Sequence, residues 1–200
     1  IDNEKPAIID GDNVYRDLSS IINDISPDTI NFTTLEKIRK VDIKKLPELP
    51  GNSRVGPCVK RPQKFIGIGL NYKDHAKETG AEPPKEPIIF MKAVSSISGP
   101  NDDVILPLNS KKTDWEVELG IVIGKKASCI KEKDSYDYIF GYCLVNDISE
   151  REFQLEGTGQ WDKGKGCDTF GPIGPYIVTK DEIDDVQNLN LLLTLNGNKM

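Results

Sequence analysis

The sequence predicts a β-rich α+β fold, because short apolar, strand-like runs outnumber helix-like stretches over most of its 200 residues. The strongest strand predictions are the runs at 115–123 and 138–145. Shorter runs of the same kind occur at 65–70, 87–92, 103–106 and 189–195. Strands and helices do not alternate as β-α-β units, which argues against a parallel, doubly wound sheet.

The N-terminal part differs from the rest of the chain and predicts a small α/β module. Residues 7–15 place short apolar runs around an Asp-Gly pair, which is typical of a β-hairpin. Two weak helical stretches follow near 17–24 and 33–39, and a connector rich in proline and glycine spans 46–53. Such connectors are found at domain boundaries. The predicted domains are therefore 1–56, a small module with its linker, and 57–200.

The second predicted domain contains some helical signals among its strands. Short helices are expected at 72–78 and 147–156, and a glycine-rich loop is expected at 157–171. The turn-forming pair Asn196-Gly197 is followed by only three residues. We therefore expect this domain to be incomplete at its C-terminal end, since a hairpin without its second strand leaves an unpaired edge.

Composition and charge exclude several classes of protein. A net charge of −6 argues against nucleic acid or an anionic membrane surface as the main partner, because both select for clustered Lys and Arg. No apolar run approaches the length of a transmembrane helix, and the N-terminus lacks the pattern of a signal peptide. We expect a soluble, cytoplasmic protein with no nucleic-acid partner and no membrane partner.

The four cysteines give no sign of a disulfide framework or a zinc site. Cys58, Cys129, Cys143 and Cys167 are widely and irregularly spaced, and no Cys-x-x-Cys pair occurs. Reduced thiols are the better interpretation.

Two acidic residues share one face of a predicted strand. Side chains alternate along a strand, so Glu116 and Glu118 point to the face opposite Val117, about 7 Å apart along the chain. A solvent-exposed face is the simpler explanation of such a pattern. The alternative is a hard divalent cation, which takes carboxylate oxygens as ligands.

Asp147 follows the apolar run 142–145 and allows two interpretations. The pattern Asp-x-x-Glu from Asp147 to Glu150 is typical of a helix start, in which Asp147 caps the helix. The carboxylate can also bind a metal ion. One oxygen can serve each role, so the two interpretations are compatible.

His75 is the only histidine in the chain, and Glu78 lies one helical turn after it. Side chains at this spacing share a helix face and can touch. A carboxylate beside an imidazole raises its basicity, as a general base at neutral pH requires. A lone histidine on a surface helix often has no such role.

The expected loop at 157–171 combines several glycines with Lys163 and Lys165. Glycines allow backbone amides and a lysine to approach an anion closely. The loop lacks the pattern of a phosphate-binding P-loop, and a flexible surface loop is the simpler interpretation.

These separate signals occur in an order that resembles the catalytic domain of the fumarylacetoacetate hydrolase family. The matching segments are GLNYKDH at 69–75, DWEVELG at 114–120, VNDIS at 145–149, REFQ at 151–154 and KGKGCDTFGP at 163–172. The resemblance runs from about Phe65 to Met200, roughly two-thirds of the chain. It implies rolled, mostly antiparallel β-sheets and a homodimer.

The resemblance also implies a metal site for Mg²⁺ or Mn²⁺. Its ligands would be Glu116, Glu118 and Asp147, and three carboxylates leave about half of an octahedral shell open to water and substrate. Both metals take the same oxygen ligands, so the ligand set does not distinguish between them.

The remaining site residues carried over from the family contact the substrate or activate water. Lys165, Gln154 and Thr169 would bind the substrate, a small 2-oxo acid, and Lys165 would offset negative charge that develops on its oxygens. His75 and Glu78 would form the pair that activates the attacking water.

The implied activity is hydrolysis of a carbon–carbon bond in 2,4-dioxo acids, such as acylpyruvates or diketo-deoxy sugar acids, through a metal-bound enolate. Lyase, decarboxylase, dehydratase and isomerase reactions of the same family use the same enolate, and ureidoglycolate lyases share the segment at 151–172. A different class is also open, in which a non-catalytic β-module uses the carboxylates to bind a structural metal.

Overall fold

The computed structural model describes residues 4–80 and 82–200, apart from the side chains of Glu78 and Thr79. Within these residues, no helix is long and apolar enough to cross a membrane. The four cysteines are free, as the sequence predicts.

Strands outnumber helices, and both are short. The strands are β1 Ala7–Ile9, β2 Tyr15–Asp17, β3 Phe65–Gly69, β4 Ile88–Lys92, β5 Ile97–Ser98, β6 Thr113–Asp114, β7 Val117–Ile123, β8 Ile139–Asn146, β9 Ser149–Glu150, β10 Gly171–Pro172, β11 Val178–Thr179, β12 Thr194–Leu195 and β13 Asn198–Lys199. The helices are α1 Phe32–Arg39, α2 Lys73–Thr79, α3 Arg151–Leu155 and α4 Asp162–Lys165. Single 3₁₀ turns lie at 43–45, 94–96, 180–182 and 186–188, and a longer one at 132–138.

The strands pair in small, mostly antiparallel sheets. The central sheet has the order β11-β8-β7, and β7 and β8 pair over most of their length, from Val117 with Asn146 to Ile123 with Ile139. Strands β3 and β4 form a second antiparallel pair, and only β5 and β10 pair in parallel among the described residues. The fold is therefore mixed α+β with short antiparallel sheets, as the sequence predicts.

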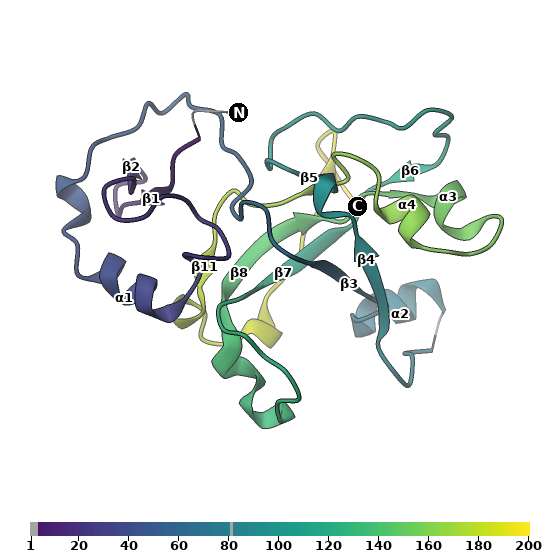
Figure 1. Ribbon diagram of the computed structural model, residues 1–200. Coiled ribbons are helices and arrows are strands. Elements are labelled where there is room, and N and C mark those ends of the chain that lie inside the picture. The colour runs from purple at the N-terminus through teal and green to yellow at the C-terminus, as the bar shows by residue number, and fades with distance from the viewer. Residues whose placement is uncertain (1–3, 81) are drawn as a thin grey trace.

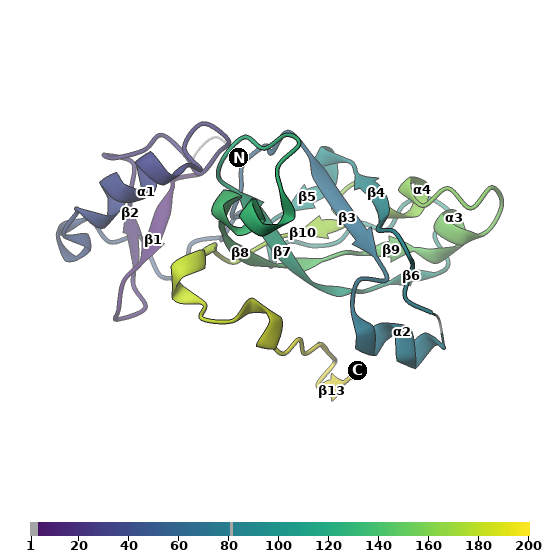
Figure 2. The ribbon, with the colours of Figure 1, turned by 90° about the horizontal axis from the view of Figure 1, so that it is seen from below.

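The ribbon separates the N-terminal elements from the helices of the second half (Figure 1). Strands β1 and β2 and helix α1 lie on one side of β8, and α3 and α4 lie beyond β4 on the other side. Helix α2 also lies away from the N-terminal elements, beside the ends of β3 and β4 in both views (Figure 2).

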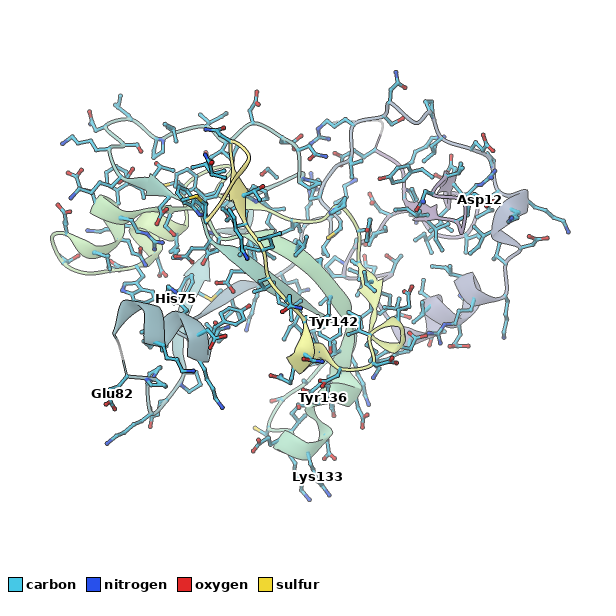
Figure 3. The ribbon with its side chains drawn as sticks, turned by 180° about the vertical axis from the view of Figure 1, so that it is seen from behind. Asp12, His75, Glu82, Lys133, Tyr136 and Tyr142 are labelled. Atoms are coloured by element: carbon cyan, nitrogen blue, oxygen red, sulfur yellow. The ribbon has the colours of Figure 1, made fainter. Side chains whose placement is uncertain are left out.

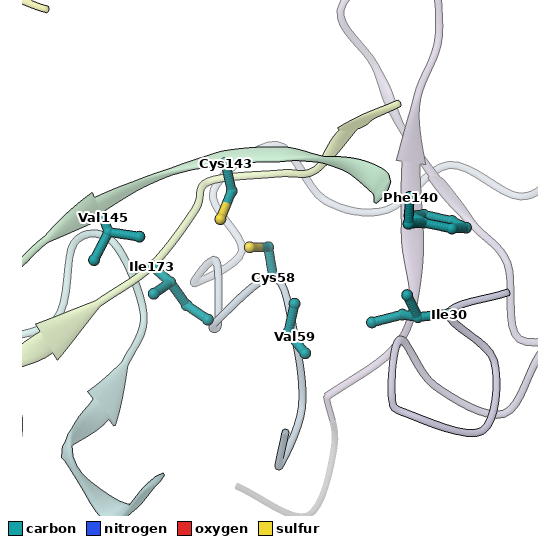
Figure 4. Packing of buried hydrophobic residues seen from close by; sticks show 7 residues of the cluster. All are labelled: Ile30, Cys58, Val59, Phe140, Cys143, Val145 and Ile173. Atoms are coloured by element: carbon teal, nitrogen blue, oxygen red, sulfur yellow. The ribbon is translucent and has the colours of Figure 1, made fainter. Parts of the chain in front are cut away.

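A cluster of buried apolar side chains joins the N-terminal part to the central sheet (Figure 4). Its members are Ile30, Cys58, Val59, Phe140, Cys143, Val145 and Ile173. Ile30 and Phe140 face one another across the two parts, and Val122 of β7 packs against the cluster. Side chains from before and after the predicted boundary at 56 therefore pack into the same core.

Several sequence-based expectations about single elements are wrong. The helix expected near 17–24 is one helical turn, closed by hydrogen bonds from the amides of Ile21 and Ile22 to the carbonyl of Leu18. The loop expected at 157–171 contains α4. The strand expected at 189–195 is ordered as a strand only at its end, where β12 and β13 form a hairpin around Asn196-Gly197. Both turn residues have positive φ, as such a two-residue hairpin requires.

The helix expected at 147–156 begins later than predicted. Ser149 and Glu150 remain extended because they pair with Asp114 and Thr113 of β6. The helix cap is Glu150, whose side chain accepts from the Glu152 amide. Asp147 therefore does not cap this helix, and its carboxylate is available for other partners.

The buried carboxylate of Glu150 joins the segment 110–113 to the start of α3. Its donors are the hydroxyls of Ser110 and Thr113 and the amides of Lys111, Lys112 and Glu152. Burial alone would raise the pKa of Glu150, but these hydrogen bonds outweigh it and hold the pKa below the ordinary value of 4.5. Glu150 thereby fixes the chain before β7 against the start of α3.

We predict that Glu150→Gln lowers the melting temperature most at neutral pH. A carboxyl whose pKa is depressed in the folded state stabilises the fold above its unfolded pKa, and this contribution is lost as pH falls through the folded value. The difference from the wild type should therefore be largest near pH 7 and narrow below about pH 4.5. Thermal unfolding followed by circular dichroism between pH 7 and 3 measures this, with the exposed Glu86→Gln as the control. A difference that does not change with pH would contradict the assignment.

Candidate functional site

Pairing of β7 with β8 brings Glu116 and Asp147 together from positions 31 residues apart. Glu116 directly precedes β7, and Asp147 directly follows β8. The amide of Asp147 donates to the carbonyl of Glu116 at 2.9 Å, and the amide of Glu116 donates to Oδ1 of Asn146 at 3.2 Å. The two carboxylates are thus held on neighbouring strand ends.

Lys165 of α4 bridges these two carboxylates. Its Nζ lies 2.6 Å from Oε2 of Glu116 and 2.8 Å from Oδ2 of Asp147. The residue is 2% exposed, and its ammonium lies 5.0 Å from the ring centre of Phe90. A buried ammonium needs such anionic partners, because burial without them is costly.

A glycine allows α4 to approach α3 closely enough to place Lys165. A Cβ atom on Gly164 would lie 2.3 Å from the carbonyl oxygen of Glu150 and 2.7 Å from atoms of Gln154. Only glycine fits between these helices. The glycines that predicted a loop therefore serve, at this position, a close helix contact.

A second buried lysine contacts the other oxygen of Asp147. Nζ of Lys92, at the end of β4, lies 2.6 Å from Oδ1 of Asp147. This contact is an ion pair by distance, but its geometry does not make a hydrogen bond, so Oδ1 remains a buried oxygen without a donor. Burial lowers the pKa of Lys92, and the charge of Asp147 opposes that shift.

Arg151 of α3 holds the remaining oxygen of Glu116. Its Nη1 lies 2.6 Å from Oε1 of Glu116 and donates to Oε1 of Gln154 at 3.0 Å. The other side of the guanidinium contacts Asp114, with Nη2 2.8 Å from Oδ2. Arg151 therefore connects Gln154, a predicted substrate contact that is 3% exposed, to the carboxylates.

Glu118 faces the same side of β7 as Val122, which packs into the core. The solvent-exposed face considered from the sequence is therefore wrong for this residue. The pKa of Glu118 is raised to about 7, mainly by burial. A hydrogen bond with Tyr72 opposes this shift, and the charges of Glu116 and Asp147 contribute to it. The Tyr72 hydroxyl also accepts from the Leu119 amide at 3.2 Å, and burial raises its own pKa to about 12.

The predicted water-activating pair lies on a separate helix. His75 is exposed on α2, on the side of the molecule opposite Asp12 of the N-terminal part (Figure 3). Helix α2 begins after Tyr72 and ends at Gly80, which has a positive φ. The backbone of Glu78 belongs to this helix, but its side chain lies outside what the structure describes. The roles of both residues stay predictions.

Thr169, the third predicted substrate contact, is tied to a different segment. Its φ is 65°, and its hydroxyl accepts from the amide of Ile105 at 2.8 Å. It makes no described contact with the ion pairs around Asp147. A surface hollow beside α3 also lies outside them, and its lining residues are Glu152, Phe153, Glu156, Gly157 and Lys163.

Three further residues belong to this site, and no role was predicted for them: Tyr72, Lys92 and Arg151. A signal existed for Lys92, because strand alternation places it on the same face as Phe90, which is buried. Tyr72 and Arg151 lie within the matching segments 69–75 and 151–154, but their contacts depend on how α2 and α3 pack.

The donor set fits a hard divalent cation. Glu116, Glu118 and Asp147 offer oxygen ligands only, and Oδ1 of Asp147 is buried without a hydrogen-bond donor. Among residues 4–80 and 82–200, however, no three acidic, histidine or cysteine side chains lie close enough together to hold a metal as they stand. Lys165 instead neutralises two of the three carboxylates.

Comparison with known proteins places this site in a family. Residues 64–200 match the model described as "Fumarylacetoacetate (FAA) hydrolase C-terminal". A Burkholderia ambifaria protein named "Putative hydrolase" is 53% identical over 196 residues, which cover 98% of this chain and 70% of that protein. A protein of the same name from Burkholderia lata is 54% identical over the same coverage.

Solved structures agree with this assignment. A "putative HpcE protein" from Mycobacterium smegmatis aligns with a TM-score of 0.80 and 33% identity, covering 98% of this chain and 71% of that one. A "probable 2-hydroxyhepta-2,4-diene-1,7-dioate isomerase" from Mycobacterium abscessus aligns with a TM-score of 0.77 and 30% identity, covering 98% and 68%. A fumarylacetoacetate hydrolase from Exiguobacterium antarcticum aligns with a TM-score of 0.73 and 31% identity, covering 90% and 64%. The chain therefore belongs to the fumarylacetoacetate hydrolase family.

Proposed function

We propose that the protein is a divalent-metal-dependent hydrolase that cleaves a carbon–carbon bond in 2,4-dioxo acids, such as acylpyruvates or diketo-deoxy sugar acids. The observation that carries this proposal is the buried ammonium of Lys165 between Glu116 and Asp147. Such an ammonium can stabilise negative charge on a substrate oxygen. Family membership and the hydrolase names of the Burkholderia relatives support the same reaction class.

Members of this family typically bind a divalent metal. In this chain, Glu116, Glu118 and Asp147 would hold it. The metal, once bound, supplies Lewis-acid polarisation of the substrate's 2-oxo group.

The side chains of the site would bind the substrate and transfer protons. Lys165 and Gln154, with Thr169, would bind and orient the 2-oxo acid end of the substrate. His75 would take a proton from water at a ring nitrogen, and Glu78, one helical turn later in the sequence, would raise its basicity. The water oxygen then attacks C4, and the C3–C4 bond breaks.

The electron pair of the broken bond passes to the 2-oxo acid fragment, which leaves as its enolate and takes up at C3 the proton that His75 removed from water. The other fragment leaves as a carboxylic acid. Lys165 would offset the negative charge that develops on the oxygens of the 2-oxo acid.

Isomerisation is the second candidate, because solved structures similar to this chain include proteins titled as isomerases. A shift of a double bond next to a 2-oxo group passes through the same enolate. It needs a proton moved between carbons and no attacking water, so it releases no second product.

We predict that the purified protein removes the ultraviolet absorbance of an enolised acylpyruvate and releases pyruvate. EDTA should abolish turnover, and added Mg²⁺ or Mn²⁺ should restore it. Loss of absorbance without pyruvate release, on a 2-hydroxydienoate substrate, would favour the isomerase. Turnover that EDTA does not change would contradict the metal requirement.

We predict that Lys165→Met lowers kcat/KM at least about a hundredfold, the usual effect of removing one group that stabilises developing charge. The matched control is Lys163→Met on the same helix, because Lys163 is exposed and lies outside the ion pairs. Steady-state kinetics at saturating metal compare the two variants. Equal activity of both variants would remove Lys165 from the mechanism.

A further inference from the structure

Lys92 is a buried lysine for which neither the sequence motifs nor the proposed mechanism supplies a role. It is 2% exposed and stands at the end of β4. Its Nζ donates to the carbonyl of Lys165 at 2.6 Å and to the carbonyl of Ile148 at 3.1 Å, and it lies 2.6 Å from Oδ1 of Asp147. A single ammonium thus contacts three separate parts of the site.

These contacts surround the ammonium. A lysine has three N–H donors and no acceptor. Two of them donate to carbonyls, and the remaining side of the group faces the Asp147 carboxylate in an ion pair, so no side is open to a substrate. Its burial also keeps Lys92 from touching solvent. Lys92 therefore acts through the residues that it holds.

The residues held by Lys92 are two members of the proposed site. One is Asp147, a proposed metal ligand, whose second oxygen has no hydrogen-bond donor. The other is Lys165, which Lys92 contacts through the main chain at the end of α4. Since α4 is only four residues long, this hydrogen bond limits the positions that the Lys165 side chain can reach.

We propose that Lys92 is a positioning residue that fixes Asp147 and the main chain of Lys165 relative to each other, and so sets the geometry in which the site binds a divalent cation. This inference rests on the proposed function for the part that concerns the cation. The coupling between Lys92 and Asp147 rests on the observed contacts alone.

The first test measures Mn²⁺ affinity by isothermal titration calorimetry. Lys92→Met keeps an unbranched side chain of similar size but removes the charge and all three donors. We expect its affinity for Mn²⁺ to fall at least tenfold, although removal of a nearby positive charge would by itself strengthen cation binding. The control Lys64→Met changes an exposed lysine before β3 and should stay within twofold of the wild type. Unchanged or tighter binding in folded Lys92→Met would overturn the proposal.

The second test compares melting temperatures of metal-free variants. It distinguishes a specific effect of Lys92 on Asp147 from a general loss of stability. Lys92→Met leaves the buried Asp147 carboxylate with one cation fewer, which is strongly destabilising for a buried pair. Adding Asp147→Asn removes the negative charge that has lost this cation. We therefore expect the double variant to melt above Lys92→Met alone. If the melting temperature of the double variant falls by the sum of the decreases for Lys92→Met and Asp147→Asn, the two residues are not coupled.

The two outcomes distinguish this inference from the proposed function. If the wild type neither binds Mn²⁺ nor turns over any 2-oxo acid, the proposed function fails. The melting temperatures then decide whether Lys92 positions Asp147.

Discussion

The structure of this site depends on the burial of Asp147, which is 6% exposed. A buried carboxylate is costly unless it is paired, and replacing a partner leaves an uncompensated charge. Here two ammonium groups meet it, Lys92 from β4 and Lys165 from α4. Both lysines are themselves 2% exposed. Each buried ammonium therefore needs the Asp147 carboxylate, just as the carboxylate needs them.

Several features of the fold meet this requirement. Strands β7 and β8 must pair so that Glu116 lies beside Asp147. Helix α4 must approach α3 closely, which only glycine at 164 permits. Arg151 neutralises the oxygen of Glu116 that Lys165 does not reach. Replacing buried ion pairs by well-packed apolar residues is often neutral or stabilising, so stability alone does not call for these charges. The retention of so many buried charges therefore favours a role in binding or catalysis.

Local sequence patterns predicted β3, β4, β7, β8, α1 and α2, but the strand expected at 103–106 does not form and that expected at 189–195 forms only at its end. The alternation in β7 and the apolar run of β8 were sufficient, because side-chain period and residue type depend on near neighbours. The start of α3 was wrong, because Ser149 and Glu150 pair with β6, more than thirty residues earlier, and this long-range pairing overrides the helix signal at Asp147. Tertiary contacts likewise determine that the stretch near 17–24 forms one helical turn and not a longer helix.

The residues of the candidate site were likewise predicted in part. The family resemblance named Glu116, Asp147 and Lys165, and the structure brings these three into direct contact. Gln154 joins them through Arg151, and Glu118 shares their electrostatic environment. No motif identified Lys92, although its place in the alternation of β4 marked it as buried. The positions of His75 and Thr169 relative to a substrate depend on a complex, which sequence does not describe.

The central claim is that Glu116, Glu118 and Asp147 together bind one divalent cation. Anomalous diffraction from crystals grown with Mn²⁺ tests it most directly. The account predicts one strong anomalous peak at about 2 Å from oxygens of all three carboxylates, with the Lys165 ammonium moved away from at least one of them. Crystals in which Lys165 still bridges Glu116 and Asp147, with no peak between the carboxylates, would contradict it.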